Sequence, residues 1–91
     1  SLAAYEVHVA RYYAKLGAHV AAINRAQQAI SDYEGVPAVE EALAILVKSY
    51  DAMGMAVLRD DALRVLRKNY PQSVYLQGNA PQKSKNRWLP W

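Results

Sequence analysis

A set of residues recurs 37 positions apart in this chain of 91 residues. A fixed period of this size within helix-forming sequence is typical of helical repeat arrays. One helical hairpin cannot bury its apolar face alone, so the period predicts stacked hairpins, which usually present surfaces to other proteins. The recurring residues are Tyr13, Leu16, Gly17 and Tyr33, matched by Tyr50, Met53, Gly54 and Tyr70.

The composition favours close-packed helices in one small domain. Hydrophobic residues make up 53%, with much alanine, while glycine and proline number only four each; alanine is the best helix former. The absence of cysteine excludes disulfides, thiolate metal sites and thiol nucleophiles. No apolar run reaches about 18 residues, so no membrane-spanning helix is expected.

The net charge of +3 has a definite location. Residues 1–71 hold eight basic and eight acidic side chains, and the excess comes from Lys83, Lys85 and Arg87. Because a nucleic-acid-binding fold more often carries a basic face, we expect no nucleic-acid partner. Two rival hypotheses concern the basic tail with its tryptophans. In the first, the tail stacks on single-stranded nucleic acid. In the second, it contacts anionic lipid headgroups.

Apolar residues at spacings of three and four predict four helices, at residues 2–16, 18–33, 37–53 and 56–69. Gly17 and Gly54 are expected to end the first and third helices in the left-handed conformation. Pro37 suits a helix start and Pro71 stops the fourth helix. The side chains expected to be buried are Leu2, Tyr5, Val9, Tyr12, Tyr13 and Leu16; Val20, Ile23, Ala26, Ile30 and Tyr33; Val39, Leu43, Leu46, Val47, Tyr50 and Met53; and Leu58, Ala62, Val65, Leu66 and Tyr70.

The predicted fold class is all-α, with two stacked antiparallel αα-hairpins at residues 1–35 and 36–71. Residues 72–91 lack helical periodicity and are predicted to form a flexible, basic tail that ends in Trp88 and Trp91. We expect the chain to be a fragment of a longer protein. Part of the apolar face of the first helix is then uncovered, which predicts self-association or a partner on that face.

Each hairpin resembles a tetratricopeptide repeat. Gly17 matches the glycine between the two helices, and Tyr13 matches an aromatic position. Ala10, Ala22 and Ala29 match the small-residue positions. The second copy departs from the motif at Arg59 and Leu66, where the motif prefers alanine.

Residues 2–69 also resemble the C-terminal part of the BamD family, also called ComL or YfiO. The resemblance implies a lipoprotein subunit of the bacterial machine that inserts β-barrel proteins into the outer membrane, held at the periplasmic leaflet by an upstream N-terminal lipid. The matching residues are Tyr5-Glu6, Val9-Ala10, Tyr12-Tyr13, Gly17-Ala18, Val20-Ala21, Asn24-Arg25, Asp32-Tyr33, Ala42-Leu43, Tyr50 and Met53.

The resemblance implies that this part of the family docks the last POTRA domain of BamA, the barrel subunit, with BamC and BamE nearby. Unfolded outer-membrane proteins would be recognised by upstream repeats. Arg25 matches an arginine that pairs with a BamA carboxylate, a task that suits its planar guanidinium. The expected partner-binding residues are therefore Arg25 with Asn24, Gln28 and Tyr12.

The sequence predicts neither catalysis nor a bound cofactor or metal. His8 and His19 lie on different helices without a cluster of further ligands. The serines have no nucleophile-elbow context, and no glycine-rich phosphate loop is present. The alternative to BamA docking is a tetratricopeptide adaptor of another system, which binds a peptide in its concave groove.

Overall fold

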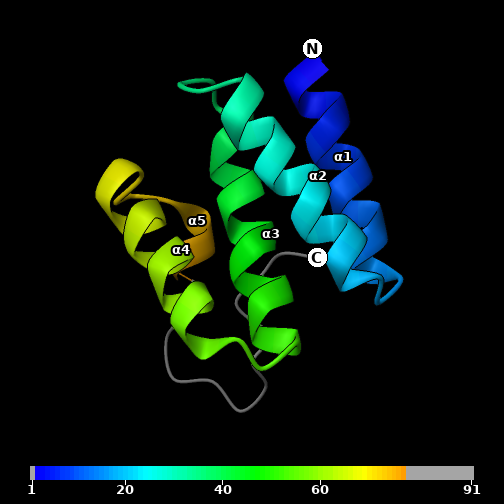
Figure 1. The fold of residues 1–91 in the computed structure, drawn as a ribbon. Coiled ribbons are helices and arrows are strands. Elements are labelled where there is room, and N and C mark those ends of the chain that lie inside the picture. Colours follow the sequence, from blue (N-terminus) through cyan, green and yellow to red (C-terminus); the bar gives the residue numbers. More distant parts are fainter. Residues whose placement is uncertain (1, 78–91) are drawn as a thin grey trace.

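The computed structural model describes residues 2–77, which form five helices (Figure 1). Their bounds are Leu2–Lys15 (α1), His19–Asp32 (α2), Ala38–Ala52 (α3), Ala56–Asn69 (α4) and Val74–Gln77 (α5). No strand occurs within residues 2–77. The predicted all-α class is confirmed, and the four predicted helices agree with α1–α4 to within one residue at each end.

The four long helices form two antiparallel hairpins that stack through α3. α1 pairs with α2 and α3 pairs with α4, while α3 also packs against α1 and α2, so it lies in the middle of the array (Figure 1). Consecutive residues of α3, from Ala42 to Val47, are all buried. A helix that is apolar over most of its circumference has to be covered by several neighbours, and the charged residues of α3 lie along one part-buried edge.

Gly17 ends the first hairpin's α1 with a Schellman motif. Its φ of +83° is left-handed, as the sequence predicted. The Ala18 N–H donates to the Tyr13 carbonyl at 2.9 Å, and the Gly17 N–H donates to the Ala14 carbonyl at 3.1 Å. These bonds satisfy carbonyls that a helix end otherwise leaves without partners.

The same motif recurs 37 residues later at Gly54, whose φ is +74°. The Met55 N–H donates to the Tyr50 carbonyl at 2.9 Å, and the Gly54 N–H donates to the Asp51 carbonyl at 3.1 Å. The period in the sequence is therefore a period in backbone geometry.

The turn after α4 repeats the turn after α2, and α5 follows from it. Ser73 N–H donates to the Tyr70 carbonyl at 2.9 Å, as Val36 N–H donates to the Tyr33 carbonyl at 3.2 Å. α5 thus begins where the first helix of a third hairpin would begin, and Tyr75 and Leu76 in it pack against the core. The predicted tail begins at residue 72 and includes α5, because a helix of four residues is too short to show periodicity in the sequence. The rest of the tail, residues 78–91, lies outside the described residues.

The prediction of which face of α1 is buried was wrong. Leu2, Tyr5, Tyr12 and Leu16 are between 58% and 71% exposed. The buried residues are instead Ala3, Val7, Ala10 and Ala14, on the opposite side of the helix. Small side chains at a contact let helix axes approach closely, so the alanines face the core. Tyr13 packs partly buried against that core, as expected, and Val9 is half-buried.

The other three stripes were predicted more accurately. Val39, Leu43, Leu46, Val47 and Tyr50 of α3 are buried as expected, as are Ile23, Ala26, Ala62 and Leu66 on α2 and α4. Ile30, Tyr33 and Tyr70 pack partly buried against the core. Four expected core residues are instead exposed, namely Val20, Met53, Leu58 and Val65.

Replacing Gly54 should reveal the cost of the left-handed turn. A Cβ at this position meets no atom within 4 Å, so the penalty comes from the backbone alone. We expect Gly54→Ala to lower the free energy of unfolding by about 1–2 kcal/mol, measured by urea denaturation. Gly54→Asn should lose less, because asparagine tolerates this conformation better. An unchanged stability in Gly54→Ala would contradict the role assigned to the motif.

Candidate interaction surfaces

Arg25 lies on the exposed side of α2 and reaches towards α1. Its Nη1 lies 3.3 Å from Oε1 of Glu6, and the two side chains are 46% and 27% exposed. A strong charge-assisted hydrogen bond is shorter, at about 2.7–2.9 Å. This loose pair orients the guanidinium and leaves further N–H groups to bind a second carboxylate.

The other predicted partner-binding residues divide between two helices. Asn24 is exposed next to Arg25, and Gln28 donates from Nε2 to Oδ2 of Asp32 at 2.7 Å within α2. Tyr12 belongs to α1, is 58% exposed, and lies 6.1 Å from the Tyr13 ring between centroids. The structure thus groups Asn24, Arg25 and Gln28 on α2, and it places Tyr12 on the apolar face of α1.

That apolar face, which we call the α1 face, has a counterpart inside the array. Of the residues 37 positions later, the first four lie on α3 and are buried, and the last follows the end of α3 and is exposed; α3 packs against α1 and α2. The residues of the α1 face therefore occupy the repeat positions that, on α3, pack against the preceding helical hairpin. The α1 face consists of Leu2, Tyr5, Val9, Tyr12 and Leu16, which correspond to Val39, Ala42, Leu46, Ser49 and Met53.

The opposite end of the array has different chemistry. On α2, Gln27 and Ile30 face α3: Gln27 donates to the Tyr50 hydroxyl at 2.9 Å, and Ile30 packs against the core. Their equivalents on α4 are Arg64 and Arg67, both exposed. This face of α4 is therefore charged, whereas the corresponding face of α2 packs against α3 and the α1 face is apolar.

We expect this 91-residue chain to self-associate through the α1 face. Sedimentation velocity should show a mass that rises with concentration. The double variant Tyr5→Glu with Leu16→Glu should remain monomeric, because two buried carboxylates would be costly. Val57→Glu changes a still more exposed apolar residue, which lies on α4, and this variant should still associate. A strictly monomeric parent chain at high concentration would contradict this expectation.

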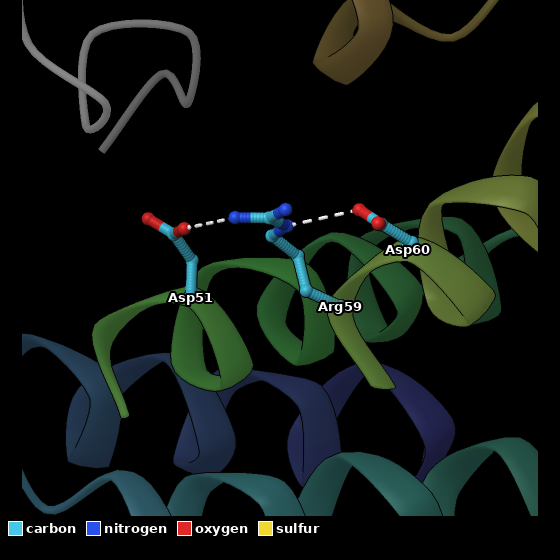
Figure 2. Close-up of polar contacts among 3 residues, drawn as sticks. All are labelled: Asp51, Arg59 and Asp60. Atoms are coloured by element: carbon cyan, nitrogen blue, oxygen red, sulfur yellow. Dashed lines mark hydrogen bonds and ion pairs between the residues drawn. The ribbon is translucent and has the colours of Figure 1, made fainter. Parts of the chain in front are cut away.

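Arg59 joins the two helices of the second hairpin (Figure 2). It lies 2.8 Å from Oδ1 of Asp51 and 3.0 Å from Oδ1 of Asp60. The hydrogen bonds that Arg59 donates, first to Asp51 and second to Asp60, raise the pKa of Arg59. The residues equivalent to Asp51 and Arg59 in the first hairpin are Ala14 and Ala22, which are both buried. The second hairpin thus has an ion pair at the two positions where the first hairpin has buried alanines.

This comparison predicts a compensating pair of substitutions. Arg59→Ala should lower the midpoint of thermal unfolding, because Asp51, which is 16% exposed, loses a cation. Adding Asp51→Ala should recover part of the loss, since the double variant carries the two residues found in the first hairpin. A double variant less stable than the sum of the single effects would contradict the account.

A hollow of about 480 Å³ lies between the N-terminal halves of α1 and α3 and beside Tyr75. Val7 contributes to its apolar wall, and His8 and Glu40 line it. Arg11 donates from Nη1 to Oε2 of Glu41 at 2.5 Å, which ties α1 to α3 within the hollow. This surface is formed by the first helices of the two hairpins.

The part of the chain that the structure describes offers little for metal or membrane chemistry. Residues 2–77 contain no group of three histidine, aspartate or glutamate side chains that could hold a metal ion. None of the described helices has the length and hydropathy required to cross a membrane.

Burial and, to a lesser extent, the charge of Lys15 lower the pKa of Lys48. This lysine lies on the packed helix α3 and not in a hollow described above.

Two stacked hairpins with repeated glycine turns define a helical-repeat fold of the tetratricopeptide kind. Comparison with family models gives a more specific assignment. The model of YfiO, described as an outer membrane lipoprotein, matches residues 1–66. The chain therefore belongs to this family.

Curated relatives extend the match to the whole chain. The outer membrane protein assembly factor BamD of Neisseria meningitidis serogroup A is 47% identical over 91 residues, which are 100% of this chain and 34% of the relative. BamD of Neisseria gonorrhoeae is 45% identical over the same residues, again 34% of its length. BamD of Xylella fastidiosa strain Temecula1 is 37% identical over 84% of this chain and 26% of its own.

The chain spans about a third of the length of the Neisseria relatives. Their match includes residues 72–91, which the resemblance seen in the sequence did not cover. No solved structure matches the chain.

Proposed function

We propose that this chain is a non-catalytic scaffold of outer-membrane protein assembly, which docks the last POTRA domain of BamA through the outer surface of α2. Membership of an outer membrane lipoprotein family and the assembly-factor name of its relatives support this role. The observation that carries the docking site is Arg25, which is 46% exposed and held by one loose ion pair. The partner supplies a carboxylate to this guanidinium.

The packing of α2 prepares Arg25 for such an exchange. Ala22, Ala26 and Ala29 are buried in α2, so the helix is fixed and its exposed side has one orientation. The Glu6 carboxylate competes for Arg25 only through a long contact of 3.3 Å, so a partner carboxylate displaces it at little cost. Once water is excluded, a bidentate pair with a partner carboxylate is shorter and stronger than the pair with Glu6.

In this proposal the protein lies at the periplasmic side of the outer membrane, held by an N-terminal lipid of the full-length protein. BamC and BamE are neighbours in the same assembly, and upstream repeats receive unfolded outer-membrane proteins. No cofactor takes part.

Reversing the charge of Arg25 should weaken docking specifically. We expect Arg25→Glu to raise the Kd for the isolated POTRA domain by at least about tenfold, because it places two like charges in the interface. Arg64→Glu is the matched control, since Arg64 is more exposed and lies on α4 in an ion pair with Asp61. Its Kd should remain close to that of the parent chain, measured by isothermal titration calorimetry.

Glu6→Gln provides a second variant with an effect in the other direction. It removes the carboxylate that competes for Arg25, so docking should be unchanged or tighter while the helices stay intact. Undiminished binding of the POTRA domain by Arg25→Glu would contradict the contact assigned to Arg25. Absence of binding by the parent chain would remove the proposed function.

A second candidate function is an adaptor that binds a peptide on the side of the array formed by α1 and α3. The hollow of about 480 Å³ beside Arg11 and Glu41 favours it. Titration with short C-terminal peptides separates the two functions, because docking of BamA requires a folded partner and peptide binding does not.

A further inference from the structure

A groove runs over α3 between the second helices of the two hairpins, α2 and α4. One part, beside Tyr50 and Leu58, has a volume of about 350 Å³. A second part of about 460 Å³ extends to Gly35 and Tyr70. We call the combined surface the α2–α4 groove. Its two parts share the side chains of Ile30, Leu43 and Val65 in their walls.

The apolar wall on α4 is larger than the fold requires. Leu58 is 45% exposed and Val65 is 41% exposed, and both line the groove. In the first hairpin the equivalent positions hold Ala21 and Gln28. The repeat thus folds with a small or polar residue at either place. Large apolar side chains left in water without a packing role are typical of a surface that another molecule covers.

The charge of the groove is of one sign. The charged side chains that line it are Asp61 and Glu34, both acidic. Asp61 forms an exposed pair with Arg64 at 2.7 Å, whereas Arg64 itself does not line the groove. A partner with aliphatic side chains and a cation near Glu34 therefore complements the groove in both hydropathy and charge.

Polar groups along the groove match an extended backbone better than a helix. Gln27, which is exposed, donates from Nε2 to the hydroxyl of the buried Tyr50 at 2.9 Å, and its carbonyl oxygen is left for a further bond. Ser31 and Asn69 add donors and acceptors along the same surface. A helix satisfies its own backbone groups, but an extended segment needs such partners.

We propose that the α2–α4 groove binds an extended segment of another polypeptide, with alternating aliphatic side chains and a lysine or arginine beside Glu34. The 14 residues of α4 span about 21 Å at 1.5 Å per residue, which about six extended residues would cover. Every second side chain of the segment enters the apolar part. This site is separate from Arg25, which reaches from α2 towards α1.

The test uses the full 91-residue chain and a fluorescent seven-residue peptide that alternates valine with serine and ends in lysine. Fluorescence anisotropy should show saturable binding. The double variant Leu58→Ala with Val65→Gln carries the first hairpin's residues at these positions, so it should keep its circular dichroism spectrum. Its affinity should be roughly tenfold lower, because most of the apolar contact on α4 is lost.

Two further comparisons locate the peptide. Val57→Ser removes an exposed valine of α4 that does not line the groove, and it should bind as the parent chain does. Glu34→Gln should weaken binding of the lysine peptide several-fold without affecting a peptide that ends in glutamine. This pattern would fix the direction of the bound segment.

Absence of saturable binding overturns the proposal, as does equal affinity in the double variant. Displacement of the peptide by a synthetic copy of residues 79–91 would assign the groove to the chain's own C-terminal segment, and would overturn it too. Binding that fails here while the POTRA domain still binds leaves the docking through Arg25 intact.

Discussion

Burial of α3 between the other helices is the constraint on which the rest of the structure depends. α3 contacts α1, α2 and α4, and its buried residues include leucine, isoleucine and valine. Alanines of α1 and α2 let these helices approach closely, and the two glycine turns, 37 residues apart, have the same pattern of hydrogen bonds. Without this packing, neither hairpin would have an apolar face large enough to hold its helices together.

The repeat explains the two ends of the array and the surfaces between them. Identical backbone turns place different side chains at equivalent positions, so each difference points to a local role. The ion pair of Asp51 and Arg59 replaces two alanines, and Arg64 replaces Gln27 on the outermost helix. The hydrogen bonds of the glycine turns are the same in both hairpins, so one framework supports both a charged face on α4 and an exposed apolar face on α1.

The sequence predicted the fold well because its strongest signals are local. Glycines at one period set the turns, and four helices followed within one residue of their observed ends. The buried face of α1 was missed because the largest apolar side chains were assigned to the core, whereas Ala10 and Ala14 occupy it. Alanine has little hydrophobic area, so its preference for close helix contacts can be recognised only when the neighbouring helix is known.

The candidate sites were less predictable, because they depend on contacts between helices. Arg25 could be selected from its resemblance to a family position, but its partner Glu6 is 19 residues away on another helix. The α2–α4 groove combines residues of three helices, and no local pattern indicates it. Arg59 was visible as a departure from the repeat motif, although its two carboxylate partners were not.

The central claim is that a rigid stack of hairpins presents α2 to a folded partner. Hydrogen–deuterium exchange of the chain, alone and with the BamA POTRA domain, tests it most directly. We predict that α3 amides exchange most slowly in both states, and that the partner slows exchange chiefly in α2. Rapid exchange throughout α3 would contradict the rigid stack, and an α2 unaffected by a bound partner would contradict the docking surface.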